Sequence, residues 1–138
     1  MGALTQDRNI WRRDGQVLRL PVKAGARIYK GAMVCVDDGL AVPATDSRNG
    51  LRFAGVAIDA GDNTGKPDGI ATVRVYTSGV FPMKREGARD ADLGRLAVVV
   101  DDQTVCPQPD DLSGLLAGRV VGVIGAEEVE VRIDGYAL

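Results

Sequence analysis

Histidine is absent from this chain of 138 residues, and its absence removes several kinds of chemistry at once. Serine and cysteine triads, imidazole proton shuttles and His-ligated metal sites all need that side chain. The two cysteines, Cys35 and Cys106, are too few for a four-thiolate zinc site or an iron–sulfur cluster. The remaining candidates are carboxylates, the two thiols, one glycine-rich loop and the basic clusters.

Carboxylates are concentrated in turns and on one strand face. Adjacent aspartates form three pairs, Asp37-Asp38, Asp101-Asp102 and Asp110-Asp111. Their oxygens suit Ca²⁺, but none has EF-hand spacing, and aspartate also supports turns by bonding its own backbone. Glu128 and Glu130 would share a solvated strand face opposite Val129 and Val131. We predict turn and surface roles, no metal site and no catalytic acid–base pair, with calcium held between separate loops left open.

The glycine-rich stretch 61–66 resembles a phosphate-binding loop only superficially. Three residues separate Gly61 from Gly65, where a P-loop has four, and Pro67 follows Lys66 where Ser or Thr is required. We therefore predict a plain solvated loop. No other motif indicates a cofactor, and none is expected.

The two thiols occupy apolar surroundings. Cys35 lies between Val34 and Val36, and Cys106 follows Val105. A reactive cysteine needs nearby positive charge or a helix N-terminus. We predict that both are small core or edge residues rather than nucleophiles.

Basic residues cluster twice, at Arg12-Arg13 beside Trp11 and at 84–89. Acidic neighbours dilute both clusters, the net charge is −2, and aromatic residues make up only 4% of the chain. Nucleic-acid binding needs a basic footprint or a stacking platform, so no nucleic-acid partner is predicted. No apolar run approaches the roughly 20 residues that span a bilayer, so no membrane partner is predicted either.

The first residues lack the basic region and apolar stretch of a signal peptide. We therefore expect the chain to fold in a reducing cytoplasm, with both cysteines as free thiols.

Short apolar runs separated by glycine and paired acids fill the rest of the chain. Strands are predicted at 16–22, 32–36, 40–42, 51–58, 70–76, 80–83, 95–100, 104–106, 120–124 and 129–133. Turn signals every eight to twelve residues or so are typical of an all-β sandwich or barrel. We predict one compact β domain over 16–138, jelly-roll-like or β-tulip-like, with an extended N-terminal arm over 1–15. No fixed-period internal repeat is evident.

Several segments, in this order, resemble a known family. They include 4–9 (LTQDRN), 21–34 (PVKAGARIYKGAMV), 53–57 (FAGVA), 62–65 (DNTG), 79–81 (GVF) and 100–105 (VDDQTV). Their order and spacing are similar to those of small head proteins of Mu-like prophages, the capsid decoration or cement proteins of tailed phages. The resemblance covers most of the chain.

The resemblance implies a non-enzymatic virion protein that binds the outside of an assembled capsid and stabilises contacts between major capsid subunits. It implies synthesis in the cytoplasm of the host bacterium and a final place on the capsid exterior. The partners implied are the major capsid protein and other copies of the chain, with a homotrimer favoured over a homodimer. It transfers no catalytic residue.

For the arm we hypothesise direct capsid contact through Trp11, Arg12 and Arg13. Tryptophan is favoured at binding hot spots, and arginine pairs well with carboxylates. The alternative is that the arm packs on its own domain or on a sister subunit. Two alternative functions stay open at this point, another head or tail structural module and a small ligand-binding β-barrel.

Overall fold

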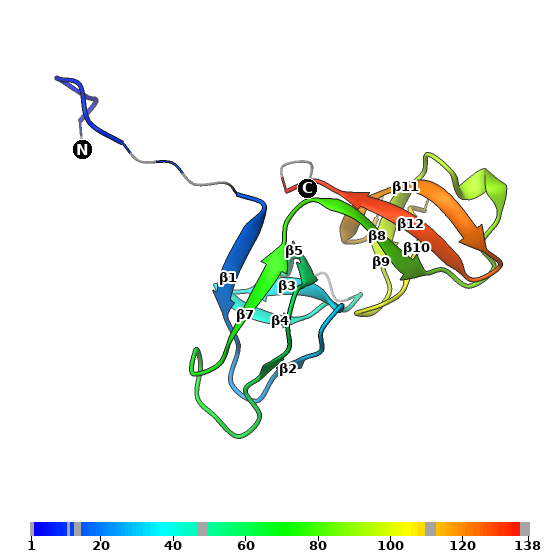
Figure 1. The fold of residues 1–138 in the computed structure, drawn as a ribbon, viewed down its shortest axis with the longest axis horizontal. Helices are drawn as coiled ribbons and strands as arrows, with labels where there is room; N and C mark the ends of the chain where they lie inside the picture. Colours follow the sequence, from blue (N-terminus) through cyan, green and yellow to red (C-terminus); the bar gives the residue numbers. More distant parts are fainter. Residues whose placement is uncertain (1, 11, 13–14, 47–49, 110–112, 136–138) are drawn as a thin grey trace.

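The computed structural model of the chain describes residues 2–10, 12, 15–46, 50–109 and 113–135, and its regular structure is almost entirely β (Figure 1). Strands β1 to β12 are, in order, Val17–Pro21, Arg27–Ile28, Met33–Asp37, Leu40–Pro43, Arg52–Ala57, Gly61–Asp62, Thr72–Tyr76, Gly79–Lys84, Leu96–Val99, Val105–Pro107, Leu116–Gly125 and Glu128–Ile133. A single 3₁₀ turn, η1, spans Asp90–Asp92. The prediction of an all-β fold is confirmed, and no helix among the described residues is long enough to cross a membrane.

The strands form two five-stranded antiparallel sheets and one two-stranded sheet. The first large sheet has the order β1-β7-β5-β3-β4, the second has the order β10-β9-β11-β12-β8, and β2 pairs with β6. Each large sheet therefore takes its strands from one half of the chain. A jelly roll alternates its strands between two sheets, so this connectivity does not support a jelly-roll topology.

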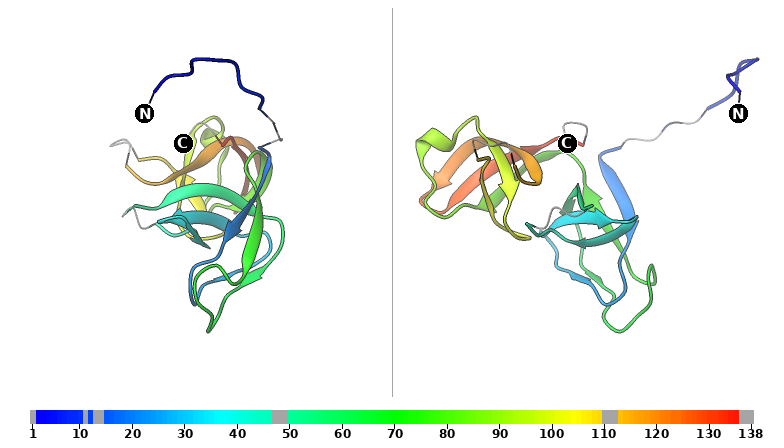
Figure 2. Two further views of the ribbon diagram at one scale, coloured as in Figure 1. Left: turned by 90° about the vertical axis from the view of Figure 1, so that its left-hand side faces the viewer. Right: turned by 180° about the vertical axis from the view of Figure 1, so that it is seen from behind.

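Each large sheet is closed by one parallel bridge between its outermost strands. Val22, just after β1, bridges to Ala41 of β4, and the Lys23 amide donates to the Ala41 carbonyl at 3.1 Å. In the second sheet Lys84 of β8 bridges to Thr104, just before β10. Each half is thus a small barrel, the first barrel over 17–76 and the second barrel over 79–133. Figure 2 shows them side by side.

The two barrels have the same strand order and the same register. The five strands of each large sheet can be numbered by their order along the chain. Around each barrel they then follow the order first, fifth, fourth, second, third. These are β1, β7, β5, β3 and β4 in the first barrel and β8, β12, β11, β9 and β10 in the second. Val34 pairs with Gly55 in the first barrel, and Ala97 pairs with Gly118 in the second. Both members of the second pair lie 63 residues further along the chain, 34 to 97 and 55 to 118. A bulge follows each glycine pair at the same place.

The structure therefore repeats one strand arrangement, although no fixed-period repeat is evident in the sequence. One trace of the repeat survives in the sequence, where 36–43 reads VDDGLAVP and 100–107 reads VDDQTVCP. Elsewhere the halves share only the pattern of buried positions, because strand pairing needs the right face and register rather than a particular residue.

Strand β3 joins the barrels because both of its faces are buried. Val34 lies in a core cluster inside the first barrel, together with Val73 and Val75. Met33 and Cys35 point the other way, into the core cluster that fills the second barrel. The first barrel is therefore packed inside and is also covered on one outer side.

Two glycines allow the fifth strand of each barrel to lie close to the fourth. A Cβ atom on Gly55 would collide with the backbone carbonyl of Tyr76, and one on Gly118 would collide with that of Arg132. Gly55 also has φ +155°, which side-chain-bearing residues rarely adopt. An isolated glycine inside a strand such as 51–58 is typical of a bulge or of a close backbone approach, and Gly55 has both.

Most predicted strands are confirmed, and two differences have clear causes. Gly61–Asp62 forms β6 inside the predicted loop 59–69, because two residues are too short to show any periodicity. Strand β11 begins at Leu116 rather than at 120, since Gly118 and Arg119 interrupt the apolar run.

The glycine packing gives a stability prediction. Gly55→Ala and Gly118→Ala should each lower the free energy of unfolding by about 2–4 kcal/mol, because the fifth strand must move away from the fourth. Gly125→Ala is the matched control, since its Cβ would meet nothing within 4 Å, and should change stability by no more than about 0.5 kcal/mol. Urea unfolding measures all three. A small effect at Gly118 with a large one at Gly55 would contradict the structural equivalence of the two sites.

Candidate binding surface at the N-terminal segment

The described residues of the N-terminal segment, 2–10 and 12, belong to no strand or helix and are exposed. Figure 1 shows this segment leading away from both barrels. Leu4 and Ile10 each expose 72% of their surface. Of the three predicted contact residues, Arg12 is exposed, and Trp11 and Arg13 lie outside the described residues.

The point at which this segment joins the first barrel is held by one residue, Thr77, through its backbone and its side chain. Thr77, between β7 and β8, donates its amide to the Gln16 carbonyl at 2.9 Å. Its hydroxyl donates to the Gly15 carbonyl. Thr77 is itself buried, so the segment begins at a defined place beside the junction of the two barrels.

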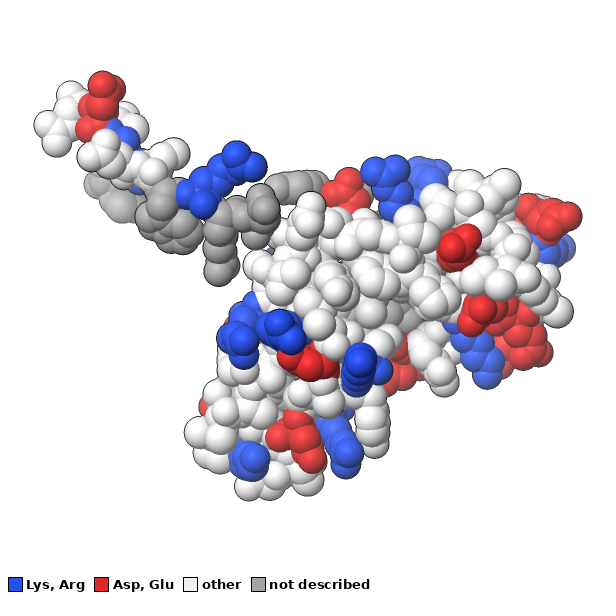
Figure 3. Space-filling model, viewed as in Figure 1, with Lys and Arg blue, Asp and Glu red and all other residues white. Residues whose placement is uncertain are grey.

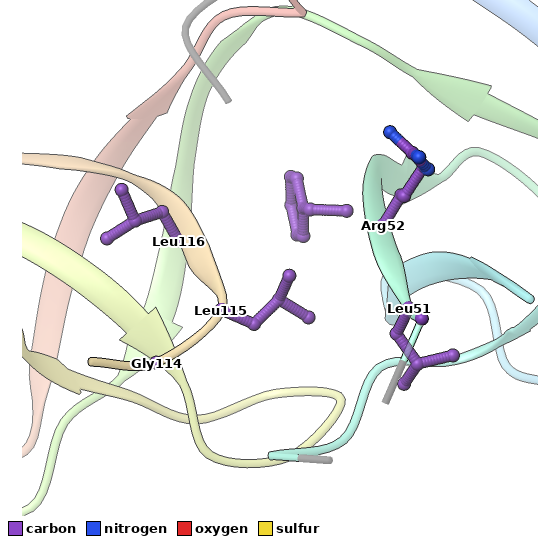
Figure 4. A pocket seen from close by; sticks show the side chains of 7 residues that line it. Leu51, Arg52, Gly114, Leu115 and Leu116 are labelled. Carbon is purple, nitrogen blue, oxygen red and sulfur yellow. The ribbon is translucent and has the colours of Figure 1, made fainter. Parts of the chain in front are cut away.

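Two hollows lie where the barrels meet. One, of about 620 Å³, is lined by apolar residues such as Leu18, Leu20 and Phe53 and lies next to the attachment point at Gly15. The other, of about 510 Å³, takes its walls from 50–53 of the first barrel and 114–116 of the second. Figure 4 shows Leu115 reaching into the space between the barrels, with Arg52 on the opposite side. Among the described residues that line them, neither hollow gathers a set of acids or thiols.

The glycine-rich loop is more ordered than the sequence predicts. Asn63 is fully buried, and its amide nitrogen donates to the carbonyls of Val22 at 3.1 Å and Pro67 at 2.8 Å. Its amide oxygen accepts from the Ala71 backbone at 3.0 Å. Asn63 thus ties the loop to the end of β1, which corrects the prediction of a plain solvated loop. A buried amide can do this because it donates and accepts at once.

The surroundings of Cys35 and of the described acidic pairs are those of structural residues rather than of reactive ones. Burial raises the pKa of the Cys35 thiol to about 11, which leaves very little thiolate at neutral pH. Asp38 and Gly39 form the tip of the β3–β4 hairpin. Asp101 accepts from the Gln103 amide at 2.9 Å, a turn that matches the prediction. The pair 110–111 lies outside the described residues.

The acids do not assemble into a metal site in the part of the chain that the structure describes. No three His, Cys, Asp or Glu side chains there lie close enough together to hold an ion. Glu128 and Glu130 lie on the exposed face of β12 opposite buried Val129 and Val131, as predicted.

Two arginines of the basic cluster at 84–89 bind one buried aspartate, Asp92. The Asp92 carboxylate is fully buried and accepts from the Arg85 guanidinium at 3.2 and 3.3 Å and from the Arg89 amide at 3.0 Å. Burial alone would raise the pKa of Asp92, but these hydrogen bonds and the two nearby guanidinium charges hold the pKa below its ordinary value of 3.8. The cluster therefore fastens the loop around η1.

Comparisons with known proteins add no assignment: no protein-family model, curated protein or solved structure matches the chain.

The Asp92 arrangement predicts a pH-dependent stability. Asp92→Asn should lower the free energy of unfolding by about 3 kcal/mol at neutral pH, because Arg85 loses its buried partner. The folded pKa of Asp92 is lowered, so its stabilising contribution is complete above pH 3.8 and is lost as the pH falls through the folded pKa. The difference in the free energy of unfolding between the parent and Asp92→Asn should therefore become smaller in acid.

Urea unfolding at neutral pH and at several values below pH 3.8 measures this gap. Asp90→Asn, at an exposed neighbouring position, is the control and should show no large gap at any pH. A gap for Asp92→Asn that stays constant across the series would mean that packing, not charge, accounts for the loss.

Proposed function

We propose that this protein is a non-enzymatic virion component that binds the outer surface of an assembled phage capsid and stabilises contacts between major capsid subunits. The similarity of segments such as 21–34 and 100–105 to capsid decoration proteins supports this proposal. A cement protein needs a rigid body and an exposed element that meets the shell, and this chain has features of both kinds.

The N-terminal segment carries the proposal. It presents two large apolar side chains, Leu4 and Ile10, to solvent on a segment that begins beside buried Thr77. Exposed apolar side chains of this size can bury their surface against a partner and so contribute to its binding. Arg8 and Arg12 on the same segment supply positive charge for capsid carboxylates. An exposed element outside any strand or helix can order on binding and extend a sheet of the partner.

A capsid lattice would amplify such contacts. Several copies of the chain in one oligomer would meet several equivalent capsid subunits at once. Linked contacts of this kind raise the overall affinity by factors on the order of 10²–10⁴ without any new interaction. Modest individual contacts from each N-terminal segment would then be sufficient.

The test is co-sedimentation with mature, empty phage heads from which this protein has been stripped. The full chain should saturate at a fixed ratio to the major capsid protein. Deleting residues 2–14 should lower occupancy by at least about tenfold, because the apolar and arginine anchors are lost together. Bound copies are counted from the pelleted heads by quantitative gel densitometry.

Point variants separate the segment from the body of the protein. Leu4→Asp combined with Ile10→Asp should weaken binding nearly as much as the deletion. Ile70→Asp is the matched control, an isoleucine that is 63% exposed near the start of β7, and should bind as the parent does. Full occupancy after the deletion would exclude the segment as the capsid contact. Failure of the full chain to bind intact heads would exclude the capsid role and favour the tail-module or ligand-binding alternatives.

A further inference from the structure

The larger hollow, of about 620 Å³, lies at one end of the first barrel, and we call it the mouth hollow. Four apolar side chains that belong to the barrel interior line it: Leu18, Leu20, Val36 and Ala54. All four are only half-buried. Gly15, from which the N-terminal segment leads away, lies at the same hollow. Open barrel mouths with apolar walls are frequent binding sites.

The second barrel shows how the same four positions look when they are filled. The offset of 63 residues that relates Val34 to Ala97 also relates these positions to four residues of the second barrel. In the order given above, the equivalents are Phe81, Met83, Val99 and Ala117. The last three are buried, and phenylalanine is larger than the leucine it replaces. The first barrel therefore leaves open a space that its duplicate closes.

Part of that closure comes from a neighbouring unit. The four residues of the second barrel lie in or against one core cluster, which also contains Met33, Cys35 and Val56 of the first barrel. Phe53 of the first barrel packs against the same cluster. Among the described residues no equivalent cover lies over the mouth hollow. By analogy, apolar side chains of another protein surface are the occupant that it fits.

A cation stands at the rim of the mouth hollow. Arg52 lines this hollow and also the smaller one, and Figure 4 shows it across the smaller hollow from Leu115. None of the ion pairs among the described residues includes Arg52. The other charged residue at the mouth hollow, Asp134, has an interaction of its own. Since arginine binds carboxylates strongly, the rim is suited to an acidic group beside an apolar one.

The charge of the whole first half favours an acidic partner as well. Residues 1–77 contain eleven Lys and Arg and eight Asp and Glu, a net charge of +3. Residues 78–138 contain six and eleven, a net charge of −5. Figure 3 shows basic side chains on the first barrel and mostly acidic ones toward the outer end of the second. An acidic partner surface is therefore attracted to the barrel that carries the mouth hollow.

We propose that the mouth hollow receives a large apolar side chain of a partner protein, while a carboxylate of the same partner segment binds Arg52. The chain's own N-terminal segment fits less well, because Arg8 and Arg12 would then approach Arg52. That the partner is the major capsid protein rests on the proposed function. The mouth hollow is then a second capsid contact, separate from Leu4 and Ile10, beside the place where their segment begins.

The first test is charge reversal, with co-sedimentation with stripped heads as the measurement. Arg52→Glu should raise the concentration needed for half-saturation by at least about tenfold, because a carboxylate then meets a carboxylate. Lys66→Glu makes the same charge change at an exposed position before the start of β7, whereas the mouth hollow lies at the end of β7. This control should bind as the parent does. Parent-like binding of Arg52→Glu overturns the proposal.

The second test blocks the mouth hollow after the protein has folded. Ser78 is half-buried and lines the hollow, so Ser78→Cys places a thiol there in a Cys106→Ser background, where Cys35 is fully buried. Coupling to pyrenyl maleimide should raise the concentration for half-saturation by at least about tenfold, because the label occupies the space of the partner side chain. Ile124→Cys, at a position 54% exposed near the tip of the β11–β12 hairpin, is the control and should tolerate the same label. Unchanged binding of the labelled Ser78→Cys protein overturns the proposal.

The third test uses protection and separates the proposal from the capsid role. Iodoacetamide should modify Ser78→Cys in the free chain, and this reactivity should be lost on saturated heads while that of Ile124→Cys remains. Undiminished reactivity of Ser78→Cys on saturated heads overturns the proposal and leaves the capsid role standing. Failure of the full chain to bind heads overturns both. Low reactivity in the free chain that rises on deletion of residues 2–14 identifies the chain's own segment as the occupant and also overturns the proposal.

Discussion

The burial of both faces of β3 is the constraint on which the rest of the molecule depends. Val34 is packed inside the first barrel while Met33 and Cys35 are packed against the second. A strand covered on both sides cannot slip by one residue without exchanging its two cores. The register of β3 therefore positions β4 and β5 around it, and through the shared cluster it holds the two barrels together.

The duplication separates what the fold requires from what the surface is free to change. Val73 and Val75 of β7 correspond in register to Val129 and Val131 of β12, and all four are fully buried. Between them, Arg74 of the first barrel corresponds to Glu130 of the second, and both are exposed. The interior has kept the same residue type because a barrel interior accepts little change in volume. At this exposed position the charge is reversed at little cost, so the two barrels differ in surface charge.

The surfaces with consequences for assembly lie at the junction of the two barrels. Thr77 holds the start of β1 and with it the N-terminal segment, and the same residue leads β7 into β8. Two exposed apolar residues, Tyr76 and Val80, lie one and three residues from Thr77 along the chain. A contact to a capsid through this segment would therefore be made from beside the junction of the two barrels.

The amino-acid sequence alone was sufficient for the all-β class, for most strand positions and for the inward or outward direction of residues such as Val129 and Glu130. These features follow from alternation along a strand, which is local. It was also sufficient for Cys35 as a buried thiol. The closure of two barrels and their common strand order could not be read from it. They depend on hydrogen bonds such as that from the Lys23 amide to the Ala41 carbonyl, and on glycines whose role appears only when the carbonyl of Tyr76 or Arg132 lies beside them. Such pairings join distant parts of the chain, and no local pattern records which strand will be the neighbour.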